Sequence, residues 1–203
     1  MSKRILALVH AHLVPPEDTT GIDVLEAEWK MEHDVIETLR EQGHEVRVLG
    51  VHDDLAGIRP TAGFFEPHIV FNLMEAFADV TTFDQNVVSY LELLRLRYTG
   101  CNPRGLMLAR DKALSKKLLA YHRIPVPDFT VVRHGRKPVL SKKLQFPVIV
   151  KSLFFEASAG ISQASVVEND EQLARRVQFI HESLGTPAIV EQFIDGRELY
   201  VGV

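Results

Sequence analysis

Lysines and glutamates that interrupt apolar segments are the residues of this sequence whose positions indicate chemistry. Lys151 lies in the run FPVIVKSLFF, where a buried ammonium group needs a partner or a ligand. Glu191 lies in a second apolar run, AIVEQFI, where a buried carboxylate needs a hydrogen-bond donor. A plain alternative is open for each, because an edge-strand lysine can extend its ammonium to water and a strand glutamate can be solvated.

Two further features are compatible with nucleotide binding. Small residues dominate EASAGIS at 156–162, and the backbone N–H groups of such a flap can close over an anion. For this segment alone, an ordinary hairpin loop is the simpler interpretation. Glu198 follows the Asp195-Gly196 turn and can either accept hydrogen bonds from two adjacent sugar hydroxyls or be solvated. Neither a Walker A pattern nor a G-x-G-x-x-G pattern occurs in the sequence.

The composition argues against several classes of protein. The 203 residues include 23 Lys and Arg against 27 Asp and Glu, and this net charge of -4 argues against a nucleic-acid or membrane-surface binder. A single cysteine, Cys101, excludes an intramolecular disulfide and a Cys-rich metal site, so a reducing cytoplasm is the expected compartment. No apolar stretch reaches the roughly 18 residues of a membrane span, and the run 5–9 is better explained as a buried strand than as a signal peptide.

The elements that must position these side chains divide into two halves. Residues 1–102 alternate short apolar runs with helical periodicity, which predicts an α/β domain with a largely parallel sheet. The expected strands are Ile5–Val9, Glu45–Val51 and Ile69–Leu73, and the expected helices span 24–42 and 83–97.

The second half begins after the turn-rich segment YTGCNPRG. Residues 103–190 predict an α+β domain with hairpins and helices. Its expected helices span 106–121 and 170–184, and its expected strands include FPVIVKSLFF and ISQASVVEN. Residues 191–203 predict a hairpin that turns at Asp195-Gly196, since Asp-Gly between two apolar runs is a strong hairpin signal.

Four segments in this order resemble the ATP-grasp superfamily, and within it the D-alanine–D-alanine ligase-like branch. They are FNLMEA, YTGCNPRGLMLARDKALSKKLLAYHRIPVPDF, FPVIVKSLFFEASAGIS and IVEQFIDGRELYVGV. The resemblance implies a doubly wound N-terminal domain with a parallel sheet, followed by an α+β ATP-grasp central domain. It also implies an enzyme that makes an acylphosphate from ATP and the carboxylate of an amino acid or small acid, and then lets an amine displace the phosphate. Family members are commonly dimers through the N-terminal domain.

The resemblance assigns phosphate contacts to five residues. Lys112 and Lys151 fall at the two family lysines that hold nucleotide phosphates, and Lys151 also reaches the adenine side. Ser158, Ala159 and Gly160 fall on the loop that covers the phosphates. Ammonium groups and backbone N–H groups are the donors that phosphate oxygens require.

The resemblance assigns the nucleoside to residues near position 191. Glu191 matches the carboxylate that accepts a hydrogen bond from the adenine amino group, and Glu198 matches the carboxylate that binds the ribose. The hinge backbone that lines the adenine is matched by Gln192, Phe193 and Ile194.

Two local departures from the family affect the substrate rather than the nucleotide. HAHLVPPED replaces a Gly-Gly-x-Ser-x-Glu segment after the first strand, and Glu75 replaces a histidine after the third. We therefore expect a substrate other than D-alanine, with Glu75 as a candidate contact. His10 and His12 also allow a metal site, but two such histidines in a loop are more often solvated.

The family's magnesium ligands, an acidic residue and a later Glu-x-Asn, lie beyond a strand such as GRELYVGV. We therefore expect ATP and Mg2+ as cofactors. We expect the metal ligands beyond residue 203 and none of them within this chain. Residues 191–203 are then only the first hairpin of a third domain. On this expectation the chain alone is inactive as a ligase, and no catalytic residue is assigned. The alternative is a non-catalytic nucleotide- or partner-binding module derived from an ATP-grasp enzyme.

Overall fold

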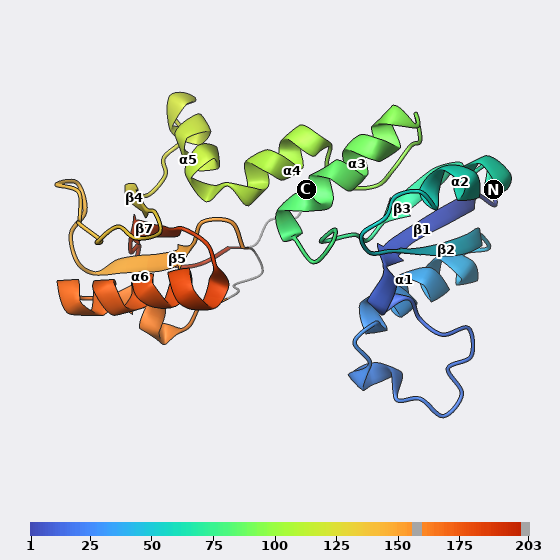
Figure 1. Cartoon of the computed structure of the whole chain (residues 1–203), viewed down its shortest axis with the longest axis horizontal. Helices are drawn as coiled ribbons and strands as arrows, with labels where there is room; N and C mark the ends of the chain where they lie inside the picture. Colours follow the sequence, from blue (N-terminus) through green and yellow to red (C-terminus); the bar gives the residue numbers. More distant parts are fainter. Residues whose placement is uncertain (156–159, 200–203) are drawn as a thin grey trace. The chain divides into compact units, whose positions relative to one another are not determined.

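The computed structural model describes residues 1–155 and 160–199 (Figure 1). The chain divides into two compact units, Met1–Met107 and Leu108–Val203. The domain bounds expected from the sequence, with a boundary at 102–103 and another at 190–191, stay predictions. None of the helices in the described part of the chain is long and apolar enough to cross a membrane.

A three-stranded parallel sheet forms the centre of the first unit. The strand β1 (Arg4–His10) lies between β2 (Glu45–Val51) and β3 (Ile69–Asn72). Both neighbours run parallel to β1, so the carboxyl ends of the three strands meet at one edge. This confirms the α/β class and the three strands expected from the apolar runs.

Helices cover both faces of this sheet. They are α1 (Lys30–Glu41), α2 (Ile58–Phe65) and α3 (Asp84–Leu93), with the short 3-10 helices η1 (Ala11–Leu13), η2 (Val24–Glu26) and η3 (Thr81–Phe83) between them. Leu6 and Leu8 of β1 pack in one core with residues of α2 and α3, and Figure 1 shows α1 on the other side of the sheet. The sequence did not predict α2, because Pro60 lies within it; a proline is tolerated there because it occupies the first turn.

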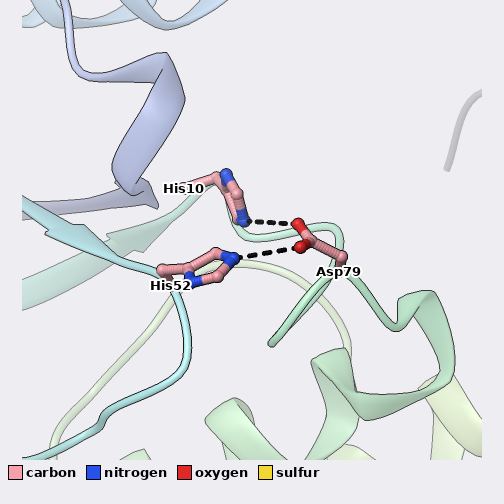
Figure 2. Close-up of side chains that lie close together, drawn as sticks. All are labelled: His10, His52 and Asp79. Carbon is pink, nitrogen blue, oxygen red and sulfur yellow. Dashed lines mark hydrogen bonds and ion pairs between the residues drawn. The ribbon is translucent and has the colours of Figure 1, made fainter.

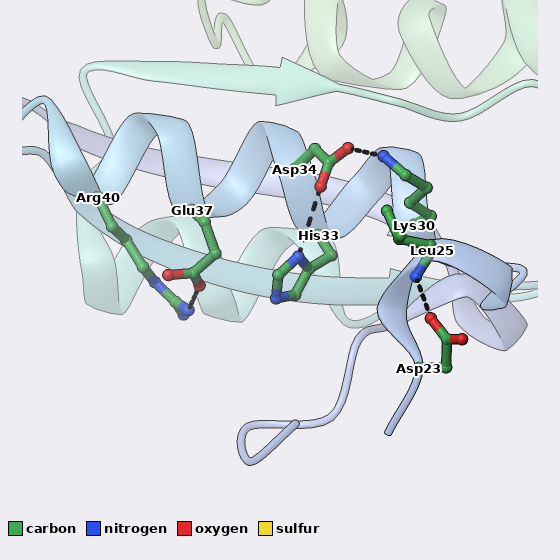
Figure 3. Close-up of polar contacts among 7 residues, drawn as sticks. All are labelled: Asp23, Leu25, Lys30, His33, Asp34, Glu37 and Arg40. Carbon is green, nitrogen blue, oxygen red and sulfur yellow. Dashed lines mark hydrogen bonds and ion pairs between the residues drawn. The ribbon is translucent and has the colours of Figure 1, made fainter. Parts of the chain in front are cut away.

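Helix α1 (Figure 3) carries ion pairs on its exposed side and one charged residue among its buried residues. Its exposed side carries the ion pairs Lys30–Asp34 and Glu37–Arg40, which contribute only a few tenths of a kcal/mol each, roughly 0.2–0.5. Its buried residues are Ile36 and, unexpectedly, Glu32. The helix therefore presents one carboxylate to the interior of the first unit.

A four-stranded antiparallel sheet forms the centre of the second unit. Its strands are β4 (Phe129–Val132), β5 (Val148–Ser152), β6 (Val166–Val167) and β7 (Ala188–Gln192), in the order β4-β7-β5-β6. Its helices are α5 (Lys112–Tyr121), α6 (Asp170–Leu184) and the 3-10 helix η4 (Gln163–Ser165), while α4 (Pro103–Arg110) spans the junction of the two units along the chain.

Successive residues of β5 and β7 point to opposite faces of this sheet. On one face Val148, Val150 and Val190 pack with the apolar residues of α6 in the main core of the unit. On the other face Ile189 packs with Ala113 of α5 in a smaller cluster. The smaller cluster leaves room on this face for the charged residues Lys151 and Glu191.

Three sequence predictions in the second half need correction. The helix expected over 106–121 is broken at Asp111, whose side chain accepts a hydrogen bond from Leu114 N and caps α5. In ISQASVVEN the structure has η4 at Gln163–Ser165, and of the expected strand only β6 at Val166–Val167 remains. Of the expected terminal hairpin, residues 193–199 form no strand, and residues 200–203 lie outside the described part of the chain.

Candidate functional site

Two neighbouring strands of the second unit bring Lys151 and Glu191 together. In the antiparallel register of β5 and β7, Ile149 is opposite Glu191 and Lys151 is opposite Ile189. The two charged side chains are therefore diagonal neighbours on the same face of the sheet. Lys151 Nζ lies 3.1 Å from Glu191 Oε2, and Glu191 as a whole is only 3% exposed.

A second lysine, which the sequence did not single out, completes this arrangement. Lys116 Nζ of α5 lies 3.5 Å from Glu191 Oε1, so each carboxylate oxygen faces one ammonium group. Lys116 follows Lys112 by one helical turn, and this i,i+4 relation was the available signal. Two ammonium groups around one carboxylate leave an excess positive charge that favours an anionic ligand.

The other predicted phosphate lysine has a different position. Lys112 Nζ donates a hydrogen bond to the carbonyl oxygen of Phe155, and Lys112 N–H donates to Leu153 O over 3.3 Å. Phe155 directly precedes residues 156–159. Lys112 is thus placed beside the entry to the predicted phosphate-covering loop.

Only one end of that loop belongs to the described part of the chain. Ser158 and Ala159 lie outside it, whereas Gly160 is described, with a φ of +69°. A Cβ atom at this position would lie 2.8 Å from Leu184 Cδ1, so that side chain would have to shift, and the positive φ itself disfavours a larger residue. Arg176, itself only 9% exposed, donates a hydrogen bond to the Gly160 carbonyl.

A cavity of about 470 Å³ opens beside Lys151 and Glu191, and this volume is typical of small-molecule sites. Six of the residues assigned to ATP line it, namely Lys151, Glu191, Gln192, Phe193, Ile194 and Glu198. The cavity combines the Lys151 ammonium group, carboxylates and apolar surface, which are contacts that a nucleotide needs. The residues present therefore fit ATP.

Gln192, which lines this cavity, fixes the end of β7 by hydrogen bonds. Its backbone N–H donates to Asp128 O over 2.9 Å, and its side-chain Oε1 accepts a hydrogen bond of 3.1 Å from Gln145 N. Its side-chain Nε2 donates to Pro147 O over 3.2 Å. These bonds hold the end of β7 in place, whereas Ile194 is 64% exposed and offers an apolar surface to a planar group.

A second cavity, of about 400 Å³, lies in the first unit and is strongly acidic. Glu28, Glu32, Glu75 and Asp79 all line it. Glu32 is 2% exposed, and burial, reinforced by the charge of Glu75, raises the pKa of its carboxyl group. A site of this kind favours a cation or an ammonium group as its ligand.

Comparisons with known proteins agree with this geometry. A family model described as a RimK-like ATP-grasp domain matches residues 109–199. A D-alanine–D-alanine ligase of Syntrophotalea carbinolica is 38% identical over 122 residues, which are 59% of this chain and 38% of that protein. The chain belongs to the ATP-grasp superfamily, in its D-alanine–D-alanine ligase-like branch. This confirms the resemblance seen in the sequence.

Other relatives extend the similarity of this ATP-grasp chain to the first unit. The protein y4sG of Sinorhizobium fredii is 32% identical over 176 residues, 83% of this chain and 50% of that protein. A crystal structure of the D-alanine–D-alanine ligase of Bacillus anthracis, complexed with ATP, superposes with a TM-score of 0.70 at 20% identity, covering 96% of this chain and 60% of that one. The structural likeness confirms the fold, and the chain spans about half the length of the curated relatives that it matches.

Proposed function

We propose that this ATP-grasp chain provides the nucleotide-binding part of an ATP-dependent ligase that joins a carboxylate to an amine through an acylphosphate. The observation that carries the proposal is the buried Glu191 carboxylate held between Lys116 and Lys151 at the wall of the cavity. ATP with Mg2+ supplies the phosphoryl group in such a reaction. We also propose that the domain boundaries lie at 102–103 and 190–191, that the protein forms a homodimer and that it acts in the cytoplasm.

In this proposal the chain's own residues position charge rather than perform covalent chemistry. Lys151, which lines the cavity, offsets phosphate charge, while Glu191 pairs with the ammonium groups of both Lys151 and Lys116. Lys112 and Arg176 donate hydrogen bonds to the carbonyl oxygens of Phe155 and Gly160, the residues on either side of positions 156–159. Glu198, which is exposed at the cavity rim, is positioned to accept hydrogen bonds from ribose hydroxyls.

The acidic cavity of the first unit supports a proposal about the substrate. Glu75 lines this cavity together with the buried Glu32, so an amino acid or small acid that carries an ammonium group would find acceptors there. Because Glu75 replaces the histidine that the family resemblance leads us to expect at this position, we propose that D-alanine is not the preferred substrate. Release of phosphate with ATP, Mg2+ and a panel of amino acids tests this point.

The nucleotide site is tested by the Lys151→Ala variant, with Lys117→Ala as its control. Loss of one charged hydrogen-bond donor weakens ATP binding by about 1.5–3 kcal/mol, or roughly 10-fold or more. Lys117 lies on the same helix as Lys116 but is exposed, so its removal is expected to leave ATP binding unchanged. Titration calorimetry with ATP and Mg2+ measures both, and equal affinities in the two variants would refute the site.

A further inference from the structure

Three side chains that are far apart in the sequence converge in the first unit (Figure 2). His10 is the last residue of β1, His52 directly follows β2, and Asp79 precedes η3. Figure 2 shows both imidazole rings directed at the carboxylate of Asp79. His10 Nε2 lies 3.6 Å from Asp79 Oδ1, and His52 Nε2 lies 3.1 Å from Asp79 Oδ2.

The parallel sheet explains why the two histidines meet. His10 is paired with Val51 in the register of β1 and β2, so the residues that leave the two strands emerge side by side. The carboxyl ends of neighbouring parallel strands are a common location for ligand sites in open α/β sheets. The convergence of His10 and His52 is therefore a direct consequence of the strand order.

A strained turn brings Asp79 to the same edge. Ala78 and Asp79 have φ values of 51° and 60°, although neither is glycine. Ala78 N–H donates a hydrogen bond of 2.8 Å to His52 O, which fixes the turn against the end of β2. Non-glycine residues in this conformation cost about 1–2 kcal/mol each and are concentrated at functional sites.

The surroundings of His52 resemble the outer shell of a metal site. Its Nδ1 lies 3.5 Å from Asp53 Oδ1, while its Nε2 faces Asp79. Histidines that bind metals usually donate their second ring N–H to a carboxylate, which orients the ring and raises its basicity. His12 adds a third imidazole, with its ring centroid 5.3 Å from those of both His10 and His52.

We propose that His10, His52 and Asp79 bind one divalent transition-metal ion, with Zn2+ as the ion that best fits the donors. Two imidazole nitrogens and a carboxylate oxygen are ligands that Zn2+ accepts, whereas Mg2+ prefers oxygen ligands alone. Metal bonds of about 2.0–2.1 Å in a tetrahedron separate the ligand atoms by roughly 3.3 Å. The ligand atoms here lie within 4.8 Å of one another, so small side-chain rotations complete the site.

The location of this metal site gives it access to a small molecule. His10 and Asp79 also line the acidic cavity of the first unit, whose volume is about 400 Å³. Three protein ligands leave a fourth coordination position for water or for an oxygen atom of a bound molecule. The site shares no residue with the nucleotide cavity, so zinc binding does not depend on the proposed ligase activity.

Titration calorimetry of the EDTA-treated chain with zinc chloride, without nucleotide, tests the proposal. We expect one Zn2+ per chain, at least about 10-fold weaker binding in His52→Ala and Asp79→Asn, and no binding of Mg2+ at this site. Asp53→Asn is expected to weaken zinc binding by about 10–100-fold through loss of the outer-shell carboxylate. His12→Ala is expected to have a smaller effect than His52→Ala, because His12 is not one of the three ligands.

Two control variants and a folding measurement make the result decisive. His122→Ala removes an exposed histidine outside the cluster, and His134→Ala disrupts the other close imidazole pair, His134 and His181. Both are expected to bind zinc like the unaltered chain. The Asp79 side chain is 73% exposed, so in EDTA the Asp79→Asn variant should unfold at the same temperature as the unaltered chain. Absence of zinc binding by the unaltered chain, or full binding in both His52→Ala and Asp79→Asn, would overturn the proposal.

Discussion

Within the described residues, each unit of this protein buries one glutamate, and the two glutamates have opposite surroundings. Glu191 in the second unit is 3% exposed and lies between the ammonium groups of Lys116 and Lys151. Glu32 in the first unit is 2% exposed, and its Oε2 atom has no hydrogen-bond partner among the described residues. Burial favours the neutral form of Glu32, whereas two cations compensate the charge of Glu191.

The comparison shows that burial alone does not define a function for a carboxylate. A compensated carboxylate such as Glu191 holds its cations in place, and these cations can then bind an anionic ligand. An uncompensated carboxylate such as Glu32 reduces the stability of the free protein at neutral pH and recovers that free energy when a cation binds. The two units therefore favour ligands of opposite charge.

The largest expected effect on stability comes from Glu191→Gln. Removing this carboxylate leaves two ammonium groups close together without their counter-charge, and we expect the free energy of unfolding to fall by about 2–3 kcal/mol. This is below the usual cost of breaking a buried ion pair, because the lysine side chains are 16% and 26% exposed. Urea denaturation measures the loss, with the exposed Glu198→Gln as a control that should change stability by less than about 0.5 kcal/mol. A loss no larger than that of the control would show that the two lysines do not depend on Glu191.

The second effect has the opposite sign and depends on pH. Burial raises the pKa of the Glu32 carboxyl group above 4.5, so the folded protein favours the protonated carboxyl group. Protonated Glu32 therefore contributes stability that is fully present below pH 4.5 and is lost as the pH rises through the pKa of the folded state. Glu32→Gln removes this dependence, so the variant should be about 1 kcal/mol more stable than the unaltered protein at pH 8.

Denaturation of both proteins at several values of pH checks this prediction. The difference between them should shrink towards pH 4.5. Glu28→Gln, which alters an exposed neighbour in the same cavity, is the matched control and should change stability at pH 8 by less than about 0.5 kcal/mol. A difference that stays constant with pH would mean that Glu32 is ionised at little cost.

A third change concerns backbone strain at the edge of the parallel sheet. Ala78→Gly removes the steric cost of a φ of 51° and is expected to raise the free energy of unfolding by about 0.5–1 kcal/mol. Ala56→Gly, in a turn with an ordinary φ, should instead lower stability by a similar amount because glycine increases the entropy of the unfolded chain. Parallel thermal denaturation of the two variants distinguishes strain from entropy, and a loss in both would argue against strain at Ala78.

The smallest effect is expected for Asp79→Asn in the absence of metal. Its contacts with His10 and His52 are at the surface, where a charged pair contributes about 0–1 kcal/mol, so we expect a change within about 0.5 kcal/mol. This would contrast directly with Glu191→Gln. A loss as large as that of Glu191→Gln in EDTA would mean that the cluster stabilises the fold rather than binding a ligand.

Much of the fold could be predicted because it depends on local patterns. The apolar runs that became β1, β2 and β3 needed no knowledge of their neighbours, and the Lys151 and Glu191 strands were visible for the same reason. The break at Asp111 was missed, because a polar residue inside a helical pattern can either continue the helix or cap a new one.

The sequence by itself determined the superfamily, the parallel sheet and most of the residues that line the cavity beside Lys151 and Glu191, since these follow from motifs and periodicity. Only the tertiary structure brought Lys116 to Glu191 and placed His52 and Asp79 beside His10. The physical reason is that these contacts depend on how α5 docks on a sheet and on which parallel strands are neighbours. Such contacts join residues that are distant in the chain, and no local pattern of residues records them.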